Sequence, residues 1–313
     1  MTDTVGIVGL GMIARFHTEA LEQLPNVDVV GGVDVDSDRT LTYRGEYRPV
    51  YGSVDELADL SPSTIIIATP TPTHYEICAR ILAQNDPPGL LIVEKPIGSS
   101  LEQVEDLLGQ KASTDVIGVY HAAHAPEVLW AASKIQQWRE RFGAITSYSA
   151  SFGDSYRDLD ARYDRVYVNS WIDSGINALS IAIRFVRLTA VDELVLMSQR
   201  GSTFRAAVRF RVDHADRVGD IGTTWDVTAP AKHSAFGMAD NVRLYLDHQA
   251  MRGVLRRGAE TVDEFSYTGD RQRLQEHYLN AFRSIFVERS GCATAGESML
   301  LHRLLFSPVV EKR

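Results

Sequence analysis

The feature that most constrains the fold of this chain is the glycine-rich segment 9–14, GLGMIA. The apolar run before it is typical of a short strand, and residues 12–24 repeat apolar side chains with helical spacing. In such a strand-to-helix turn, Gly9 permits the tight bend and Gly11 lets a ligand's phosphates approach the backbone. Ala14, at the position of a third glycine, still allows close packing of helix on strand. The segment predicts a phosphate-binding turn.

The start of the predicted helix is the second part of this signal. A helix N-terminus presents backbone N–H groups and the positive end of its dipole, which favour a pyrophosphate. The turn therefore predicts that a dinucleotide contacts Gly9, Gly11, Met12 and Ile13. The alternative is that the glycines only mark a turn.

Asp34 bears on which dinucleotide would bind. The apolar run 27–33 ends at this aspartate, twenty residues after Ala14. A carboxylate there accepts both hydroxyl hydrogens of the adenosine ribose and repels a 2′-phosphate. The sequence therefore favours NAD as the cofactor. NADP is the alternative, since Arg39 is close enough in the sequence to offset part of the repulsion of a 2′-phosphate. Asp34 also belongs to an acidic cluster, so it could instead be a solvated turn residue.

Two further apolar runs, residues 64–68 and 90–93, are separated by a helix predicted from about residue 75 to 84. Strands that alternate with helices at this spacing predict a doubly wound, parallel α/β sheet. Ligands of such sheets bind beyond the carboxyl ends of the strands. The residues after these two strands therefore complete the predicted cofactor site. They are Thr69, Pro70, Thr71, His74, Glu94 and Lys95.

Lys95 stands between Glu94 and Pro96. A lysine after a buried strand is usually a solvated surface charge, but this chain has five lysines against twenty-seven arginines. Pro96 disfavours helix at the lysine before it. A lysine also changes its pKa readily when buried, which suits it for proton transfer. We therefore expect Lys95 to be catalytic.

Three motifs in order resemble the glucose–fructose oxidoreductase/inositol dehydrogenase (Gfo/Idh/MocA) family. They are GLGMIA, then ATPTPTH at residues 68–74, then EKP at residues 94–96. The resemblance implies an NAD(P)-dependent oxidoreductase acting on CH–OH groups, with a Rossmann domain followed by an α+β domain on an open, mostly antiparallel sheet. With a predicted strand ending near residue 120, we expect domains 1–120 and 121–313. The second would bind substrate and form oligomers.

In that family, a helix entering the second domain carries an Asp-x-x-x-His pair facing the nicotinamide. Here the pair is Asp173 and Asn177, in a segment that resembles the D-galactose and L-arabinose 1-dehydrogenases. Residues 120–126 resemble an aromatic-His-x-Arg-x-Ala-Pro turn of the same subgroup. The substrate residues implied are Tyr120, His121, Asp173 and Asn177. The chain departs from the subgroup at Ala123, in a missing glutamate near residues 145–152, and in residues 167–170 before the aspartate.

The chemistry of the reaction can explain why asparagine stands in place of histidine at residue 177. Oxidising an alcohol needs a base for the hydroxyl proton. At an anomeric carbon the ring oxygen donates electron density and the hydroxyl is more acidic, so a weaker base suffices. We expect Lys95 to contact the reacting oxygen, Asp173 to accept the proton or poise Lys95, and Asn177 to hold the hydroxyl. The alternative for these two residues is that Asp173 N-caps a helix, with Asn177 on its first turn.

The leading prediction is thus oxidation of a free aldose at C1 to a lactone. The alternatives are a dehydrogenase or reductase of a cyclitol or keto-sugar, and a non-catalytic sensor that binds NAD and a sugar. A net charge of −9 without a basic face argues against nucleic acid as a partner. Cys78 and Cys292 have no metal-ligand spacing, so no metal site is expected. With no signal peptide and no membrane-length apolar run, we expect a cytoplasmic protein.

The second half of the chain predicts strands near 191–199, 203–213, 219–228, 233–239 and 242–248. Helices are expected near 126–141, 271–288 and 296–306. The polar stretch 153–170 is expected to be a loop that borders the substrate. An open sheet needs a partner for its uncovered face, so we expect a homodimer or homotetramer formed through this sheet.

Overall fold

The computed structural model describes residues 2–46, 49–109, 114–156, 168–197, 202–290, 293–306 and 310–312. The chain divides into two compact units. The first unit comprises residues 1–121 and 274–302, and the second comprises residues 122–273 and 303–313. The expected second domain, residues 121–313, included residues 274–302. In the structure these residues pack in the first unit.

The first unit is built on five parallel strands in the order β2-β1-β3-β4-β5. The strands are β1 (Asp3–Val8), β2 (Val27–Val33), β3 (Thr64–Ile67), β4 (Leu90–Glu94) and β5 (Asp115–Val119). The helices are α1 (Met12–Leu21), α2 (Ser37–Glu46), α3 (Val54–Ala58), α4 (His74–Leu82), α5 (Leu101–Gly109), α9 (Arg273–Phe282) and α10 (Ala295–Phe306). Short helical turns are η1 (Thr71–Thr73), η2 (His121–His124) and η4 (Arg283–Val287).

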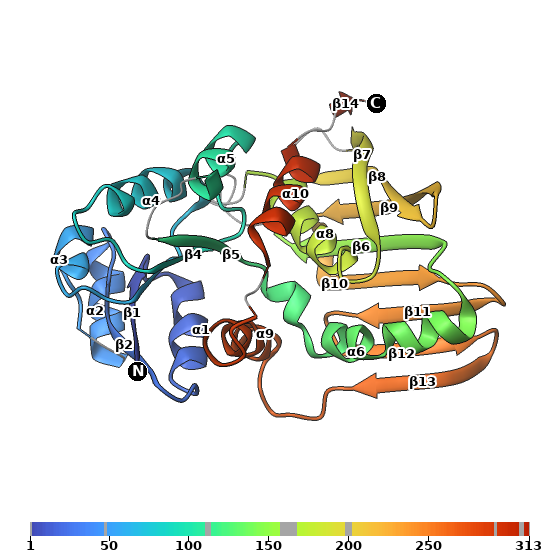
Figure 1. Cartoon of the computed structure of the whole chain (residues 1–313), viewed down its shortest axis with the longest axis horizontal. Coiled ribbons are helices and arrows are strands. Elements are labelled where there is room, and N and C mark those ends of the chain that lie inside the picture. The colour runs from blue at the N-terminus through green and yellow to red at the C-terminus, as the bar shows by residue number, and fades with distance from the viewer. Residues whose placement is uncertain are drawn as a thin grey trace. The chain divides into compact units, whose positions relative to one another are not determined.

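Helices cover both faces of this sheet, with α4 and α5 on one face and α1 and α9 on the other (Figure 1). From β2 at one edge the chain returns to β3 on the far side of β1, so the strand order reverses between β1 and β3. In doubly wound sheets ligands bind at this reversal, beyond the carboxyl ends of the strands. The predicted parallel α/β sheet is confirmed.

The core of the first unit explains why residues 274–302 belong to it. Val5 and Ile7 of β1 are fully buried, and they share one apolar cluster with Leu21 of α1. Tyr278 and Phe282 of α9 join the same cluster. Burying such aromatic side chains removes a large apolar area from water, which stabilises α9 in this position.

The second unit is built on a nine-stranded sheet in the order β13-β12-β11-β10-β6-β9-β8-β7-β14. Its strands are β6 (Ser147–Ser155), β7 (Arg187–Leu196), β8 (Thr203–Val212), β9 (Ala215–Thr224), β10 (Asp226–Gly237), β11 (Val242–Asp247), β12 (Arg252–Arg257), β13 (Glu260–Ser266) and β14 (Val310–Lys312). Its helices are α6 (Pro126–Phe142) and α8 (Ile176–Ala182), the latter preceded by the π-helical turn η3 (Trp171–Gly175). The pairs β6–β9 and β14–β7 are parallel and the others are antiparallel. The expected mostly antiparallel sheet is confirmed.

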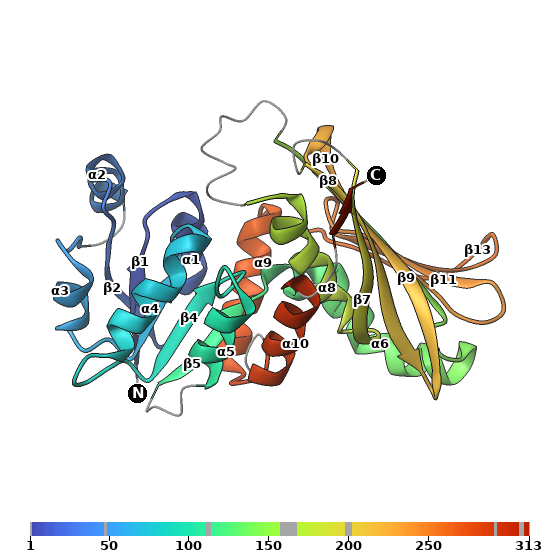
Figure 2. The same ribbon diagram turned by 90° about the horizontal axis from the view of Figure 1, so that it is seen from above.

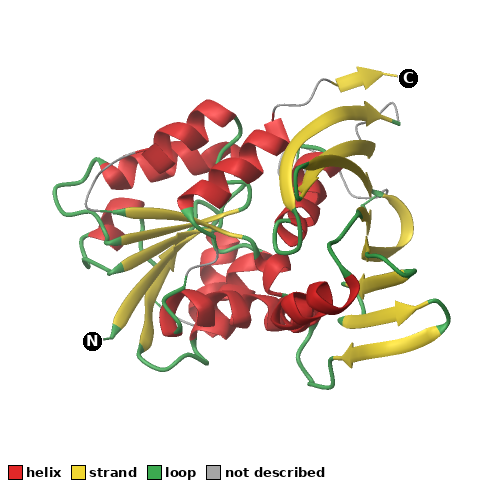
Figure 3. Cartoon of the chain, turned by 45° about the vertical axis from the view of Figure 1, so that its right-hand side comes forward, coloured by secondary structure: helices red, strands yellow, loops and turns green. Residues whose placement is uncertain are grey.

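The two faces of this sheet differ in chemistry. Helices α6 and α8 lie on the same face (Figure 2), where α6 packs on β11 to β13 and α8 on β6. On β8, buried apolar residues such as Phe204 and Phe210 alternate with exposed arginines such as Arg209. The strands (yellow in Figure 3) turn progressively relative to one another, as the twist of a large sheet requires.

Two parts of the sequence prediction differ from the structure here. The strands β12 and β13 were not expected, because many of their side chains are charged and no clear apolar alternation shows in the sequence. Residues 153–155 belong to β6 and not to a loop. The remainder of the loop predicted at 153–170 lies mostly outside the described residues, as does Cys292.

Candidate functional site

The turn after β1 has the backbone that phosphate binding needs. Gly9 has φ +92°, and a Cβ added there would lie 2.8 Å from the carbonyl carbon of Ala68, so glycine is required. Gly11 is the N-cap of α1 and supplies no side chain to cap it. A Cβ at Gly11 would meet only Arg39 Nη1, at 3.7 Å, so this position is open to a ligand. The first turn of α1, with Met12 and Ile13, therefore fits a pyrophosphate group.

Asp34 lies against this turn. Its Oδ2 accepts a hydrogen bond from the backbone N–H of Leu10 at 2.7 Å, and its Oδ1 accepts from the N–H of Asp36 at 2.9 Å. Arg39 Nη1 lies 3.7 Å from the same Oδ2. The structure thus brings the predicted ribose-binding carboxylate and the predicted phosphate-binding turn together, with a guanidinium beside both.

Glu94 anchors the strand end that carries Lys95. Its buried carboxylate accepts hydrogen bonds at Oε1 from His17 Nε2 (2.8 Å) and from the Tyr278 hydroxyl (2.7 Å). Its Oε2 accepts the backbone N–H of Lys95 at 3.2 Å. Burial alone would raise the pKa of this carboxyl, but the bond from His17, the bond from Tyr278 and the charge of Lys95 outweigh burial and lower it.

Pro96, which follows Lys95, is held by a hydrogen bond from His74. The buried ring of His74 lies between two carbonyl oxygens, with Nδ1 2.9 Å from that of Pro96 and Nε2 2.8 Å from that of Thr69. Burial lowers the pKa of His74, against an opposite effect of these two bonds. Thr69 and Pro70 follow β3, and Thr71 begins η1, so His74 ties the two predicted cofactor segments together.

His302 of α10 completes this support. Its Nε2 accepts the backbone N–H of Ile97 at 3.0 Å, and its Nδ1 donates to the carbonyl of Ser298 at 2.7 Å. Burial lowers the pKa of His302 to about 4, with the Ser298 bond acting in the opposite direction, so the ring is neutral at pH 7. The segment 94–97, which includes Lys95, is thereby fixed from both ends.

The predicted substrate residues Tyr120 and His121 belong to the same part of the first unit. Tyr120 is fully buried, and its ring centroid lies 6.4 Å from that of His302. His121 Nδ1 lies 3.3 Å from His277 Nδ1, and its ring centroid is 5.0 Å from that of Tyr278. Tyr278 thus connects His121 to the Glu94 carboxylate.

Three of these supporting residues were missed from the sequence. His17, Tyr278 and His302 carry no motif, and the last two act 184 and 205 residues away from their partners. The signal for His17 was weak but present, because it follows the glycine-rich turn on a helix that otherwise buries apolar and small residues.

In the second unit, Asp173 lies on the π-helical turn η3 and Asn177 on the first turn of α8. The N-cap positions are Ser170 and Gly175, so the alternative that Asp173 caps a helix is wrong. Asn177 Nδ2 donates to the Asp173 backbone carbonyl at 3.3 Å. Its buried Oδ1 has no hydrogen-bond donor among the described residues, which is costly unless a ligand supplies one.

A buried ion pair lies next to these residues. Lys232 Nζ of β10 is 2.8 Å from Asp154 Oδ1 of β6, and the Ser174 hydroxyl donates to Asp154 Oδ2 at 3.0 Å. Burial lowers the pKa of Lys232, as does the charge of Arg273, while Asp154 and Asp173 raise it. Neither Lys232 nor Asp154 was predicted from the sequence, where nothing marks a buried charge on a strand.

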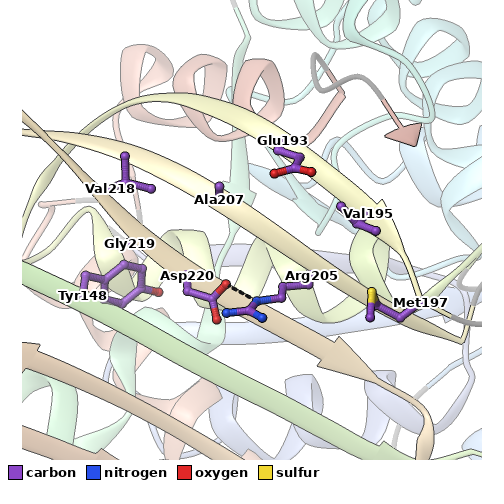
Figure 4. Close-up of a pocket in the computed structure, with 9 residues that line it drawn as sticks. All are labelled: Tyr148, Glu193, Val195, Met197, Arg205, Ala207, Val218, Gly219 and Asp220. Atoms are coloured by element: carbon purple, nitrogen blue, oxygen red, sulfur yellow. Dashed lines mark hydrogen bonds and ion pairs between the residues drawn. The ribbon is translucent and has the colours of Figure 1, made fainter. Parts of the chain in front are cut away.

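A separate pocket of about 450 Å³ lies over β7, β8 and β9 of the second unit (Figure 4). Arg205 and Asp220 point toward one another in it and form an ion pair at 2.7 Å. The pocket is lined by Tyr148, Glu193, Val195, Met197, Arg205, Ala207, Val218, Gly219 and Asp220. None of the predicted site residues is among them, so this pocket is not the predicted site.

The described part of the chain has no sign of a metal site, a membrane span or a reactive cysteine. No group of His, Cys, Asp or Glu side chains there could hold a metal ion. No helix in the same residues is long and apolar enough to cross a membrane. Cys78 is buried and unpaired, and burial raises the pKa of its thiol to about 12, which leaves it unreactive.

Comparison with known proteins agrees with this geometry. Residues 4–122 match the model of an oxidoreductase family with an NAD-binding Rossmann fold, Gfo/Idh/MocA. Glucose-6-phosphate 3-dehydrogenase of Bacillus subtilis (strain 168) is 32% identical over 100 residues, which are 32% of this chain and 27% of that protein. The match therefore spans about a quarter of this curated relative.

Solved structures resemble the whole chain in fold. UDP-N-acetylglucosamine 3-dehydrogenase GnnA from Acidithiobacillus ferrooxidans is 17% identical, with a TM-score of 0.76 over 98% of this chain and 97% of that one. A variant of KijD10, a 3-ketoreductase from Actinomadura kijaniata in complex with TDP-benzene and NADP, is 18% identical, with a TM-score of 0.77 over 100% of both chains. The family match agrees with the dinucleotide-binding Rossmann fold predicted for the first part of the chain. None of these three proteins is a galactose or arabinose dehydrogenase.

Proposed function

We propose that the chain, whose residues 4–122 match the Gfo/Idh/MocA oxidoreductase family model, transfers hydride between a sugar and a bound nicotinamide dinucleotide. The observation that carries the proposal is the fixed segment 94–97. Glu94, the carbonyl of Pro96 and the N–H of Ile97 are each held by a buried side chain. Such support is what a catalytic lysine needs, because a small misplacement of a catalytic group costs orders of magnitude in rate.

The proposed reaction divides between the cofactor and the protein. A bound NAD would supply the acceptor for the hydride of the sugar carbon, which leaves the hydroxyl proton for the protein to take as the carbonyl forms. Lys95 holds the reacting oxygen, and Asp173 accepts the hydroxyl proton or poises Lys95 to do so. Asn177 Oδ1 accepts a hydrogen bond from a sugar hydroxyl, which would satisfy its unpaired oxygen. Tyr120 and His121 are proposed as further substrate residues.

For the position of oxidation we propose C1 of a free aldose, giving a lactone. The support is chemical, since Asn177 stands where the wider family has histidine. A neutral amide is sufficient at an anomeric carbon, whose hydroxyl is more acidic and whose ring oxygen stabilises developing positive charge.

A second candidate is oxidation or reduction at C3. The curated relative and both solved proteins named above carry position 3 in their names. At C3 the ring oxygen gives no direct help, so the proton acceptor has to be stronger. In that case Lys95 becomes the favoured acceptor and Asp173 its electrostatic partner.

Methyl glycosides separate the two candidates, because they block C1 and leave the C3 hydroxyl intact. We would measure initial rates of NAD and NADP reduction with D-galactose, D-glucose and L-arabinose and with their methyl glycosides. The C1 proposal expects turnover of the free sugars alone. Equal turnover of the glycosides would exclude C1 and leave C3 as the favoured candidate. A panel of cyclitols tests the remaining alternative. Tight NADH binding without turnover of any of these compounds would favour the sensor.

A further inference from the structure

Lys232 is a charged residue in the second unit that the proposed reaction does not use. Burying an ammonium is costly, so a buried lysine needs a counterion and a reason to be there. Its counterion is Asp154, which is itself held by the hydroxyl of Ser174. Ser174 follows Asp173 on η3, so the ion pair is tied directly to the turn that carries the proposed proton acceptor.

The burial of Lys232 equals that of the proposed substrate residues. Lys232 is 8% exposed, compared with 7% each for Asp173 and Asn177. All three side chains are therefore nearly withdrawn from water. An ammonium has three N–H donors, and Asp154 is the one acceptor that the described residues offer it. Among the described residues, donors of Lys232 and the acceptor Asn177 Oδ1 are therefore left without partners near the same turn.

The charges around Lys232 indicate what it can bind. Asp154 and Asp173 are the carboxylates that act on it, and Arg273 is the other cation. Two negative and two positive groups leave no net positive charge to attract an anion. A substrate carboxylate or phosphate would also meet the repulsion of both aspartates. A neutral hydroxyl has no such penalty, and its oxygen can accept a hydrogen bond from the ammonium while its hydrogen is donated elsewhere.

We propose that Lys232 is a specificity-determining residue that donates a hydrogen bond to an uncharged sugar hydroxyl, so that the site selects neutral sugars over sugar acids and sugar phosphates. This inference rests on the proposed function, since it assumes a sugar near Asp173 and Asn177. It adds a residue and a substrate class to that proposal. It holds whether oxidation takes place at C1 or at C3.

The test is binding to the full-length protein saturated with NADH, which cannot oxidise an aldose and so separates binding from turnover. Calorimetry would compare D-galactose, D-galacturonate and D-galactose 6-phosphate, followed by D-glucose and its corresponding acid and phosphate. We expect the neutral sugars to bind at least 10-fold more tightly than their charged analogues. Lys232→Met should weaken neutral-sugar binding by about 10- to 100-fold, as expected for loss of a hydrogen bond from a charged group.

The matched control is Lys134→Met. Lys134 forms an ion pair of similar length with Asp263, at 2.7 Å, but in a half-exposed position on α6. This variant should bind the sugars as the wild type does. Because Lys232→Met leaves Asp154 buried without its counterion, the double variant Lys232→Met/Asp154→Asn provides a second version with no unpaired charge. It should fold and show the same loss.

The outcomes distinguish this inference from the proposed function. Failure of every sugar to bind the wild-type NADH complex would overturn the sugar assignment and the inference with it. Sugar binding that survives unchanged in the folded double variant would overturn the inference alone. Tighter binding of the acid or the phosphate than of the neutral sugar would do the same, and the proposed function would stand.

Discussion

At the scale of single residues, the proposed chemistry depends on Lys95 and on the groups that fix it. Both oxygens of the preceding carboxylate, Glu94, are engaged, one by His17 and Tyr278 and the other by the N–H of Lys95 itself. An arginine would fit such a backbone, but it does not give up its proton in proteins. A lysine can, which is why the identity of residue 95 matters more than its charge.

Lys95→Met is therefore expected to lower kcat by roughly two orders of magnitude or more, the usual contribution of an acid–base group. NADH should still bind, with a much smaller loss than that in kcat, because Lys95 is one of several predicted cofactor contacts and lies outside the phosphate turn at residues 9–13. Asp173→Ala should reduce kcat to a similar extent. Steady-state kinetics with the best aldose, and NADH fluorescence titration, would measure both effects. Normal turnover in both variants would remove them from the mechanism.

A second residue-scale prediction concerns cofactor choice. Asp34 repels a 2′-phosphate, whereas Arg39, 3.7 Å away, would bind one. Asp34→Ala should therefore raise the ratio of kcat/KM for NADP to that for NAD by about 10-fold or more, since removing one like-charge contact is worth more than a kcal/mol. Arg39→Ala should move the ratio in the opposite direction. A ratio unaffected by either change would place the adenosine ribose elsewhere.

At the scale of elements, two helices from the end of the chain support the strand that carries Lys95. Tyr278 on α9 binds Glu94, and His302 on α10 binds the N–H of Ile97. Both side chains are buried. Removing either one would leave its partner, the Glu94 carboxylate or the N–H of Ile97, with a lost hydrogen bond away from water, which lowers the free energy of unfolding. Loss of α9 or α10 should thus disturb the proposed catalytic residue as well as the stability of the first unit.

His302 gives this support a pH dependence. Its folded pKa of about 4 lies below the ordinary value of 6.5, so the unfolded chain binds the proton more tightly. The stability due to the neutral ring is fully present above pH 6.5 and is lost as pH falls towards 4. Over this window the loss is about 3 kcal/mol, at about 1.4 kcal/mol per pH unit.

Urea unfolding at several pH values would measure this effect. His302→Asn should be less stable than the wild type at pH 7, and the difference should shrink by about 3 kcal/mol at pH 4. The exposed His214, on the turn between β8 and β9, provides the control, and His214→Asn should follow the wild-type curve. A constant difference between wild type and His302→Asn at all pH values would show that folding leaves the pKa of His302 at its ordinary value, contrary to the buried neutral ring.

At the scale of the whole molecule, the sheet of the second unit bears on assembly. Strands β7 to β9 form the pocket of Figure 4, where the exposed apolar side chains of Met197 and Val218 adjoin the Arg205–Asp220 pair. We propose that this sheet forms the contact of a homodimer or homotetramer. Sedimentation equilibrium should give the mass of an oligomer, and Val218→Glu should raise its dissociation constant. Leu41→Glu, an equally exposed position on α2, is the control. A monomeric wild type would contradict the proposal.

The parts of the fold and of the site that could be predicted from the sequence are those marked by residues close together in the chain. The parallel sheet was predictable because strands such as Thr64–Ile67 are buried throughout and read as unbroken apolar runs. The glycine turn, Asp34 and Lys95 lie at strand ends, where a parallel sheet gathers its ligand-binding residues. These features need only a few neighbouring residues to be recognised.

The rest required the folded chain. Tyr278 and His302 act across about 200 residues, and their helices look like any amphipathic or apolar helix. Lys232 is buried beside Asp154, although lysines are normally exposed, so no pattern in the strand marks it. The strands β12 and β13, the last two at one side of the sheet, carry charged side chains that hide their alternation. In each case the partner that explains the residue is distant in sequence.

The central claim is that hydride passes from a sugar carbon to the nicotinamide. The most direct measurement incubates the wild-type protein and NAD with D-galactose deuterated at C1 or, separately, at C3. Mass spectrometry then gives the mass of the NADH formed. We expect NADH heavier by one deuterium from the C1-labelled sugar and unlabelled NADH from the C3-labelled sugar. Label transferred from C3 would move the reaction to that carbon. If the same experiment across the aldose and cyclitol panel gave no NADH, the claim of hydride transfer would be contradicted.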